Sequence, residues 1–297
     1  MSTSPWHGVV VASATPFTAD GEVALDRFQE HVVWLAENGC RGITPVGSLG
    51  EYQALSTGER EDVVRAAVEA APAGFSVVPG VSAYGGDEAL QWAEHAARVG
   101  ADAVLCLPPT AYRADAADIV RHYERVAGAG LPIIGYNNPF DTHIDLTPEI
   151  IHDVASAVPS LAAVKEFSGD LRRIHRIKEV APQVEVLAGA DDVMVEYVLM
   201  GAVGWIAGFP NSVPRFSVDV YEAARRGDIE RAVELYQVAH PLFRRDSHQH
   251  FVQAIKVSMD AVGRYGGPCR LPRQALDDDT RSAIERETKL LVDVASV

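Results

Sequence analysis

The chain has 297 residues, 47% of them hydrophobic and 23% charged, which is the composition of an ordinary soluble globular protein. Its 26 Lys and Arg against 41 Asp and Glu give a formal charge of −15, which argues against nucleic acid and anionic membranes as partners. The apolar runs are shorter than the roughly 20 residues of a membrane helix and the first residues lack a signal-peptide pattern, so a cytoplasmic protein is expected.

Short apolar segments bounded by Gly, Pro or a polar turn alternate along the chain with longer amphipathic segments. This alternation is typical of parallel strands that helices cover on the outside. The expected strands are Val9–Ala14, Gly42–Val46, Ser76–Pro79, Ala103–Leu107, Ile133–Tyr136, Ala162–Lys165, Val184–Leu187 and Val203–Ala207. The helices expected between them are Leu25–Asn38, Ser56–Ala71, Asp87–Val99, Asp115–Ala127, Thr147–Ala157, Asp170–Val180 and Asp191–Met200.

Eight strands alternating with helices predict an α/β protein of the (β/α)8 TIM-barrel class. An open doubly wound sheet is the rival fold, but it would carry a glycine-rich phosphate loop after its first strand, and Val11–Pro16 has no glycine. We therefore expect residues 1–212 to form the barrel and residues 213–297 to form a C-terminal helical extension packed on it as one structural domain. The helices expected in the extension are Val213–Arg226, Asp228–His240, Gln249–Val262 and Thr280–Ala295.

The catalytic groups of a barrel enzyme lie at the carboxyl ends of its strands and in the loops that follow. The sixth expected strand ends at Lys165, whose amine would enter the barrel mouth, where burial lowers the pKa of a lysine. A neutral amine attacks a ketone, and the resulting iminium stabilises a neighbouring carbanion. Alternatively, this lysine extends to solvent or pairs with Glu166, and for a single strand-end lysine that is the commoner case.

Two more strand ends fit the same chemistry. Tyr136 ends the fifth strand and can relay protons, although a hydroxyl bound to backbone is commoner for any one tyrosine. The loop Gly47–Glu51 (GSLGE) follows the second strand, and its glycines leave backbone N–H groups around Ser48 free to bind a carboxylate. The Ser48 hydroxyl can bridge to Tyr136, but the two glycines taken alone indicate only a turn. The loop has no basic residue to hold a phosphate.

Together and in this order, the motifs resemble the dihydrodipicolinate synthase/N-acetylneuraminate lyase family of class I aldolases. The resemblance extends from about Gly8 to Leu271. It implies a barrel enzyme that acts on pyruvate or another small 2-oxo acid, needs no metal or organic cofactor, and assembles as a homotetramer or dimer. The motifs that carry it are TPF at 15–17, GSLGE at 47–51, YNNP at 136–139, VKE at 164–166, SGD at 168–170 and GADD at 189–192.

The resemblance also implies roles for single positions. Lys165 matches the lysine that forms the Schiff base, Tyr136 matches the proton-relay tyrosine, and the Ser48 hydroxyl is the third expected catalytic group. Ser48 and Leu49 lie where backbone N–H groups hold the substrate carboxylate, and Ile206 matches a residue beside the lysine. The other residues expected to bind substrate are Gly47, Tyr112, Asp141 and Gly189.

Three positions depart from the dihydrodipicolinate synthase pattern. Leu49 replaces the second of two adjacent threonines, so a relay through two threonines and the tyrosine cannot be complete. Asp141 stands where the synthase has an arginine for the carboxylate of its aldehyde substrate, and an anion there repels a carboxylate. The paired tyrosines after the fourth strand become Ala111 and Tyr112. These differences argue against lysine biosynthesis.

The glycine loop and the YNNP motif are instead similar to branches that act on hydroxylated 2-oxo acids or cyclic imines, as are DSH at 246–248 and LP at 271–272. The leading prediction is a Schiff-base lyase like 1-pyrroline-4-hydroxy-2-carboxylate deaminase, with dehydratases of 2-keto-3-deoxy sugar acids close behind. The alternative within the family is 4-hydroxy-tetrahydrodipicolinate synthase.

A binding protein without catalysis and a metal-dependent enzyme are the alternatives from other classes. A non-catalytic 2-oxo acid sensor on the same scaffold is disfavoured because binding alone needs neither Lys165 nor Tyr136. A metal-dependent barrel would use His143, His248 and His250, but the last two fall in a loop that leads into the extension, not at a strand end. The three cysteines are widely spaced and lack a CxxC pair, so neither a zinc site nor a disulfide is predicted.

Overall fold

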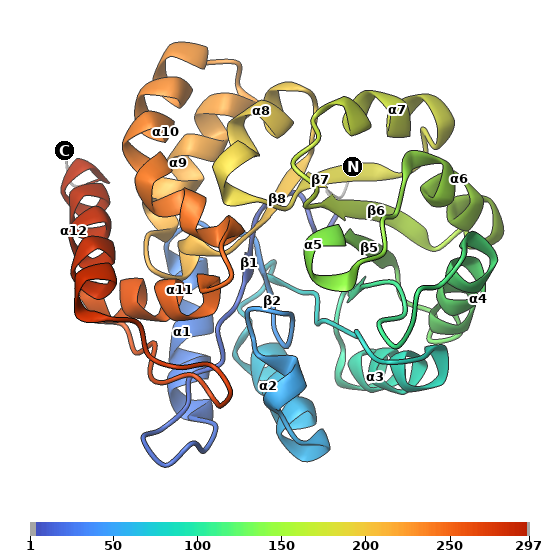
Figure 1. Cartoon of the computed structure of the whole chain (residues 1–297), viewed down its shortest axis with the longest axis horizontal. Coiled ribbons are helices and arrows are strands. Elements are labelled where there is room, and N and C mark those ends of the chain that lie inside the picture. Colours follow the sequence, from blue (N-terminus) through green and yellow to red (C-terminus); the bar gives the residue numbers. More distant parts are fainter. Residues whose placement is uncertain (1–3, 296–297) are drawn as a thin grey trace.

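The computed structural model describes residues 4–295, in which parallel strands surround a central axis and helices cover them on the outside (Figure 1). The helices of the C-terminal extension lie along one side of the barrel. The strands are β1 (Gly8–Ala12), β2 (Gly42–Thr44), β3 (Ser76–Val77), β4 (Val104–Cys106), β5 (Ile133–Asn137), β6 (Leu161–Glu166), β7 (Glu185–Ala188) and β8 (Gly204–Ala207).

The strands form a closed ring. Hydrogen-bonded neighbours follow the order β3-β2-β1-β8-β7-β6-β5-β4, and every pairing is parallel. The residues after β3 close the ring onto β4, because the N–H of Leu105 donates to the Pro79 carbonyl and the N–H of Val81 donates to the Leu105 carbonyl, both at 2.9 Å. The expected (β/α)8 barrel is confirmed, and the open doubly wound sheet is excluded.

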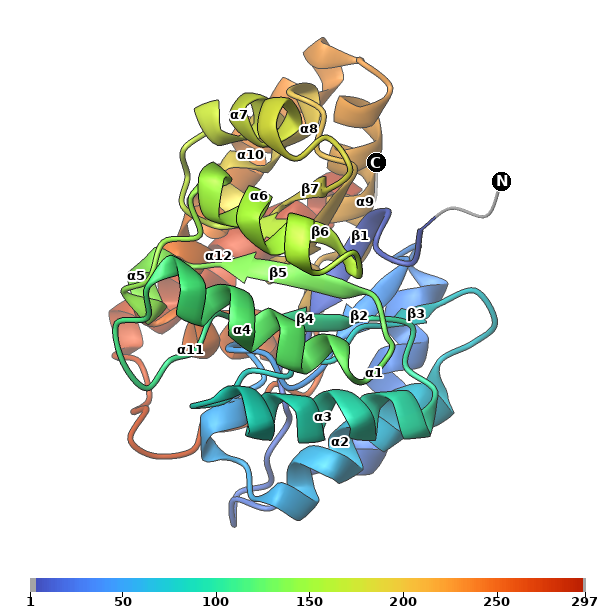
Figure 2. The same cartoon turned by 90° about the vertical axis from the view of Figure 1, so that its right-hand side faces the viewer.

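One helix follows each strand around the outside, and Figure 2 shows α6, α4 and α3 in succession along this side of the barrel. The helix after β8, α9, packs on α8 and β1, so the residues expected to begin the extension also supply the last helix of the ring. The outer helices are α1 (Leu25–Glu37), α2 (Thr57–Ala70), α3 (Gly86–Val99), α4 (Ala116–Ala127), α6 (Pro148–Ala157), α7 (Arg172–Val180), α8 (Met194–Leu199) and α9 (Pro214–Arg225).

The extension continues through α10 (Ile229–Phe243), η4 (Arg244–Ser247), α11 (Phe251–Ala261) and α12 (Asp278–Ala295). The sequence predicts a helix that ends at His240, yet α10 runs through Pro241 to Phe243. Leu242 and Phe243 are buried, so their packing outweighs the hydrogen bond that the proline cannot donate. In residues 4–295, no helix is both long and apolar enough to cross a membrane.

The inward-facing side chains of the strands form an apolar cluster inside the barrel, separate from the larger layer between strands and helices. Alternate residues of a strand point to opposite faces, so Ile134 and Tyr136 of β5 face inward, as do Ala163 and Lys165 of β6. This alternation fixes which side chains reach the barrel mouth. The cluster comprises Trp6, Val10, Val78, Ala103, Leu105, Leu107, Ile134, Tyr136, Ala163, Leu187 and Ile206.

Candidate active site

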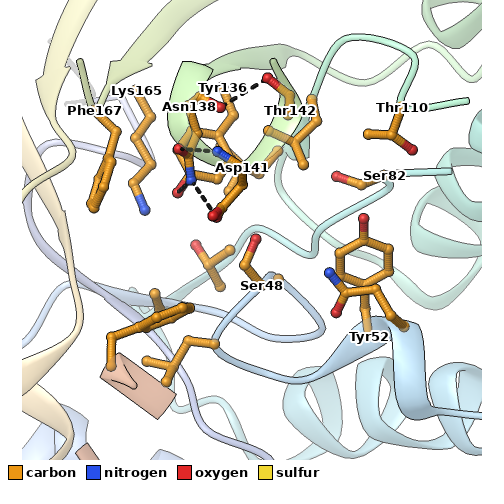
Figure 3. A pocket seen from close by; sticks show the side chains of 18 of the residues that line it. Ser48, Tyr52, Ser82, Thr110, Tyr136, Asn138, Asp141, Thr142, Lys165 and Phe167 are labelled. Carbon is orange, nitrogen blue, oxygen red and sulfur yellow. Dashed lines mark hydrogen bonds between the residues drawn. The ribbon is translucent and has the colours of Figure 1, made fainter. Parts of the chain in front are cut away.

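A cavity of about 830 Å³ opens at the carboxyl ends of the strands, which is large enough for a small-molecule substrate (Figure 3). Its floor and walls combine apolar side chains with hydroxyl, amide and carboxylate groups. Residues from the barrel loops and from the extension both contribute to it. Among the lining residues are Thr44, Gly47, Ser48, Leu49, Ser82, Thr110, Tyr136, Asn138, Asp141, Lys165, Phe167, Ile206, Gly208 and Asp246.

Lys165 and Tyr136 lie side by side at the cavity floor. The register of β5 and β6 pairs the two residues directly, and the Lys165 Nζ lies 4.4 Å from the centroid of the Tyr136 ring. Lys165 is only 5% exposed, and Figure 3 shows its amine pointing into the cavity. Glu166 faces the other side of the strand, where its carboxylate accepts hydrogen bonds from the Asn137 side chain at 3.1 Å and the Ser168 N–H at 2.7 Å. The alternative in which Lys165 pairs with Glu166 is therefore wrong.

Burial controls the protonation of both groups. It lowers the pKa of Lys165 to about 8, and the carboxylates of Asp246, Asp191 and Asp141 oppose that shift. Burial, helped by Asp141, raises the pKa of Tyr136 well above its ordinary range. The amine is thus neutral in an appreciable fraction of molecules near neutral pH, whereas the phenol keeps its proton.

The glycine loop holds a strained shape beside the amine. Val46 and Glu51 both have positive φ, at 51° and 54°, a region that side chains other than glycine rarely occupy. A Cβ on Gly80 would come within 2.6 Å of the Val46 carbonyl, so only glycine allows this close approach. Within residues 4–295, the N–H groups of Ser48 and Leu49 donate to no other group. Two free N–H groups at the cavity wall form a ready site for a carboxylate.

Side chains and backbone of the C-terminal extension hold this loop in place. Glu51 is fully buried, and its carboxylate accepts hydrogen bonds from the Lys256 amine at 2.7 Å and the Arg270 N–H at 3.1 Å. The Arg273 guanidinium lies 3.8 Å from the same carboxylate. This arrangement is not visible in the sequence, because a glycine loop gives no sign of partners more than 200 residues away.

Asp141 and Tyr136 share a hydrogen-bonding partner. The Asn138 amide donates to the Asp141 carboxylate at 2.7 Å and to the Tyr136 hydroxyl at 3.1 Å (Figure 3). Asn138 caps a short helix, α5 (Pro139–Thr142), which carries Asp141 over the cavity and which the sequence did not predict. Ser48 lies across the cavity from this group in Figure 3.

Seven of the nine residues expected from the sequence line this cavity: Gly47, Ser48, Leu49, Tyr136, Asp141, Lys165 and Ile206. Gly189 and Tyr112 do not line it, so their contact with substrate stays a prediction. A Cβ on Gly189 would come within 2.5 Å of the Glu166 carbonyl, so this glycine serves the packing of the loop after β7 against β6. Tyr112 is 55% exposed in the loop after β4, and Thr110 occupies the cavity wall instead.

The histidines of the metal hypothesis are dispersed. His248 lines the cavity, His250 lines a separate groove with Pro272 and Gln274, and His143 ends α5. In the described part of the chain, no three His, Cys, Asp or Glu side chains gather in a way that could hold a metal ion.

A buried lysine of lowered pKa beside a protonated tyrosine, at the carboxyl ends of barrel strands, defines the class of protein. It is the arrangement of class I aldolases and lyases, whose lysine forms a Schiff base with a carbonyl substrate. Residues 5–290 match the model of the dihydrodipicolinate synthetase family. The chain belongs to this family and is a class I lyase.

Individual relatives cover almost the whole chain. A 4-hydroxy-tetrahydrodipicolinate synthase of Methanospirillum hungatei is 32% identical over 290 residues, spanning 96% of this chain and 98% of its own length. An uncharacterized DapA-like lyase of Halobacterium salinarum is also 32% identical, spanning 95% of this chain and 92% of the relative. These names lend no support to the expected closer relation with the deaminases, and identity near 32% leaves the particular reaction open.

Solved structures have the same fold. A putative dihydrodipicolinate synthetase from Pseudomonas aeruginosa superposes with a TM-score of 0.92 at 30% identity, covering 96% of this chain and 99% of its own. YagE of Escherichia coli K12, a prophage protein of the family solved in complex with pyruvate, gives a TM-score of 0.90 at 26% identity, with 96% and 98% covered.

Proposed function

We propose that this chain is a Schiff-base lyase in which Lys165 attacks the carbonyl or imine carbon of a hydroxylated 2-oxo acid or cyclic imino acid. The leading substrate is 1-pyrroline-4-hydroxy-2-carboxylate. The observation that supports it most is the buried Lys165 amine, aligned in register with Tyr136 and facing a cavity whose wall offers two free N–H groups.

The proposed reaction uses three parts of the cavity. The N–H groups of Ser48 and Leu49 hold the substrate carboxylate, which places its 2-position over the Lys165 amine. Condensation gives an iminium, and loss of a proton from the neighbouring carbon gives an enamine that expels the hydroxyl group further along the chain as water. Water then hydrolyses the remaining iminium, which frees Lys165, and for the cyclic imino acid a second hydrolysis releases the ring nitrogen as ammonia. Tyr136, which keeps its proton at neutral pH, passes protons between substrate and leaving group.

Asp141 favours a hydroxylated substrate over one with a second carboxylate. Its carboxylate can accept a hydrogen bond from a substrate hydroxyl, whereas a carboxylate about 4 Å away would be repelled by about 4 kcal/mol near a protein surface. Arg60 and Arg273 also line the cavity but are already engaged. Arg60 donates to the carbonyls of Gly80 and Ser82, and Arg273 lies beside Glu51.

The second candidate is 4-hydroxy-tetrahydrodipicolinate synthase, which condenses pyruvate with aspartate semialdehyde. The names of the relatives favour it. Both reactions begin with a Schiff base at the same lysine, so they differ in what the outer part of the cavity accepts. The homotetramer or dimer implied by the sequence stays a prediction.

Parallel assays separate these candidates. One preparation would be assayed for three activities. These are release of ammonia from 1-pyrroline-4-hydroxy-2-carboxylate, condensation of pyruvate with aspartate semialdehyde, and dehydration of 2-keto-3-deoxy acids. The repulsion of about 4 kcal/mol at Asp141 predicts that kcat/KM is about a thousandfold higher for the hydroxylated substrates than for the condensation with aspartate semialdehyde.

The matched variant Asp141→Asn keeps the hydrogen bond from Asn138 but removes the charge, so it should raise the condensation rate and lower the rate on hydroxylated substrates. A wild-type enzyme that condenses pyruvate and aspartate semialdehyde faster than it consumes the others would reject the deaminase proposal. Tight binding of 2-oxo acids without turnover of any of them would favour the sensor.

A further inference from the structure

One carboxylate that lines the cavity comes from the C-terminal extension and not from a loop that follows a barrel strand. Asp246 belongs to η4, the turn between α10 and α11, and it is 8% exposed. It lines the same cavity as Lys165, and among the charged groups acting on that amine its carboxylate has the largest effect.

A glycine at the end of β8 makes room for this carboxylate. A Cβ on Gly208 would lie 2.7 Å from the Oδ1 of Asp246, closer than two such atoms can approach. The turn η4 also packs on η2 (Asp191–Val193), the turn that follows β7. Asp246 thus reaches the cavity through a space that any side chain at position 208 would fill.

The neighbouring Asp191 is also buried, and burial raises its pKa to about 7, but several hydrogen-bond donors oppose that shift. It accepts hydrogen bonds from the Trp205 indole at 3.0 Å, the Gly208 N–H at 3.1 Å and the Phe209 N–H at 2.9 Å. Three donors stabilise its negative charge inside the protein.

Asp246 lacks such support. Its Oδ2 accepts one long hydrogen bond, from the N–H of Asp191 at 3.4 Å, and its Oδ1 accepts none within residues 4–295. Burial, and next to it the charge of Asp191, raise the pKa of Asp246 well above its ordinary value. Asp246 is therefore the carboxyl of this pair that holds a proton more readily.

We propose that Asp246 is the proton partner and counter-ion of the Schiff base at Lys165, an inference that rests on the proposed function. The amine and the carboxyl hold one proton between them before reaction. The neutral amine attacks the substrate carbonyl, the carbonyl oxygen leaves as water, and the proton that this water needs comes from the Asp246 carboxyl. The products are a positively charged iminium, a negatively charged Asp246 carboxylate and one water molecule.

This exchange leaves the net charge of the buried cavity unchanged, which avoids the large cost of creating an unpaired charge there. Tyr136 can pass the proton on, but its phenol does not remain ionised near neutral pH, so it cannot be the net source. The other charged groups that act on Asp246 or on the amine are Asp191, Asp192 and Asp141, and the negative charge of each ionised carboxylate stabilises the positive iminium.

The test compares Asp246→Asn with Asp192→Asn. Both variants remove one carboxylate from the contact between η2 and η4, but Asp192 accepts from Ser247 at 2.8 Å and does not line the cavity. The trapping of pyruvate at Lys165 by cyanoborohydride would be followed by mass spectrometry across a range of pH. Loss of a general acid typically costs about 10²- to 10⁴-fold, so trapping should slow by at least about 100-fold in Asp246→Asn and stay unchanged in Asp192→Asn.

A second readout separates this role from a structural one. The Asp246 carboxylate raises the pKa of Lys165, so the midpoint of the pH profile should move to lower pH in Asp246→Asn. Formate should restore trapping in Asp246→Ala, because the small acid can occupy the space that the side chain leaves in the cavity wall. A rescue of this kind does not repair a misfolded chain.

The outcomes are distinct. Wild-type protein that forms no pyruvate adduct at Lys165 contradicts the proposed function itself. Wild-type protein that forms the adduct, together with an Asp246→Asn variant that forms it at the same rate and with the same pH midpoint, overturns only the role of Asp246. Slow trapping in Asp246→Ala that formate does not restore also overturns it.

Discussion

The lowered pKa of Lys165 predicts how the rate of Schiff-base formation depends on pH. An ordinary lysine with a pKa of 10.5 is neutral in about one molecule in 3,000 at pH 7, but with a pKa of about 8 the fraction is about one in ten. The gain in reactive amine is about 300-fold. Since only the neutral amine attacks, the trapping rate should rise about tenfold per pH unit up to pH 7 and stop rising near pH 8.

The assay follows the adduct between pyruvate and Lys165 in the presence of cyanoborohydride, with the intact mass measured against time from pH 6 to pH 10. Lys165→Arg is the control, and it should form no adduct at the active site because a guanidinium stays protonated throughout this range. A wild-type rate that keeps rising tenfold per unit to pH 10 would show that burial does not lower the pKa. A rate that is independent of pH below 8 would show that loss of a proton from Lys165 is not required.

Two further substitutions test the supports of the site. Tyr136→Phe keeps the ring that packs beside Lys165 but removes the relay, so kcat should fall about 10²- to 10⁴-fold while the melting temperature changes little; turnover at the wild-type rate would exclude the relay. Lys256→Met leaves the fully buried Glu51 without its closest cation, which should cost about 3–5 kcal/mol in the free energy of unfolding, measured by denaturant titration. The double variant Lys256→Met/Glu51→Gln should recover part of that loss, and a single variant as stable as wild type would show that the pair is not what holds the loop.

Much of the fold follows from short-range patterns in the sequence. Parallel strands covered on both faces are continuously apolar, so segments such as Ile133–Tyr136 and Ala162–Lys165 are visible without any knowledge of their neighbours. The structure ends these two strands one residue later, at Asn137 and Glu166. Because all strands of a barrel end on one rim, the same patterns also place Lys165 and Tyr136 at the cavity.

The remaining site residues depend on long-range contacts that no local pattern contains. Asp246 reaches the cavity only because η4 folds back on η2, which lies about 55 residues earlier in the chain. Tyr112 and Thr110 are two residues apart in one loop, and only the path of that loop decides which one faces the cavity. Gly189 belongs to the GADD motif, but its close packing against the Glu166 carbonyl is visible only in the structure.

The ion pair between Glu51 and Lys256 also limits how the enzyme can be redesigned. The loop that presents its N–H groups to the cavity is held by α11, a helix near the other end of the chain, so each segment depends on the other. Exchanging the glycine loop between relatives without the matching α11 would leave a buried charge unpaired and the loop unsupported. Chimeric enzymes with altered substrates should therefore inherit both segments from the same parent.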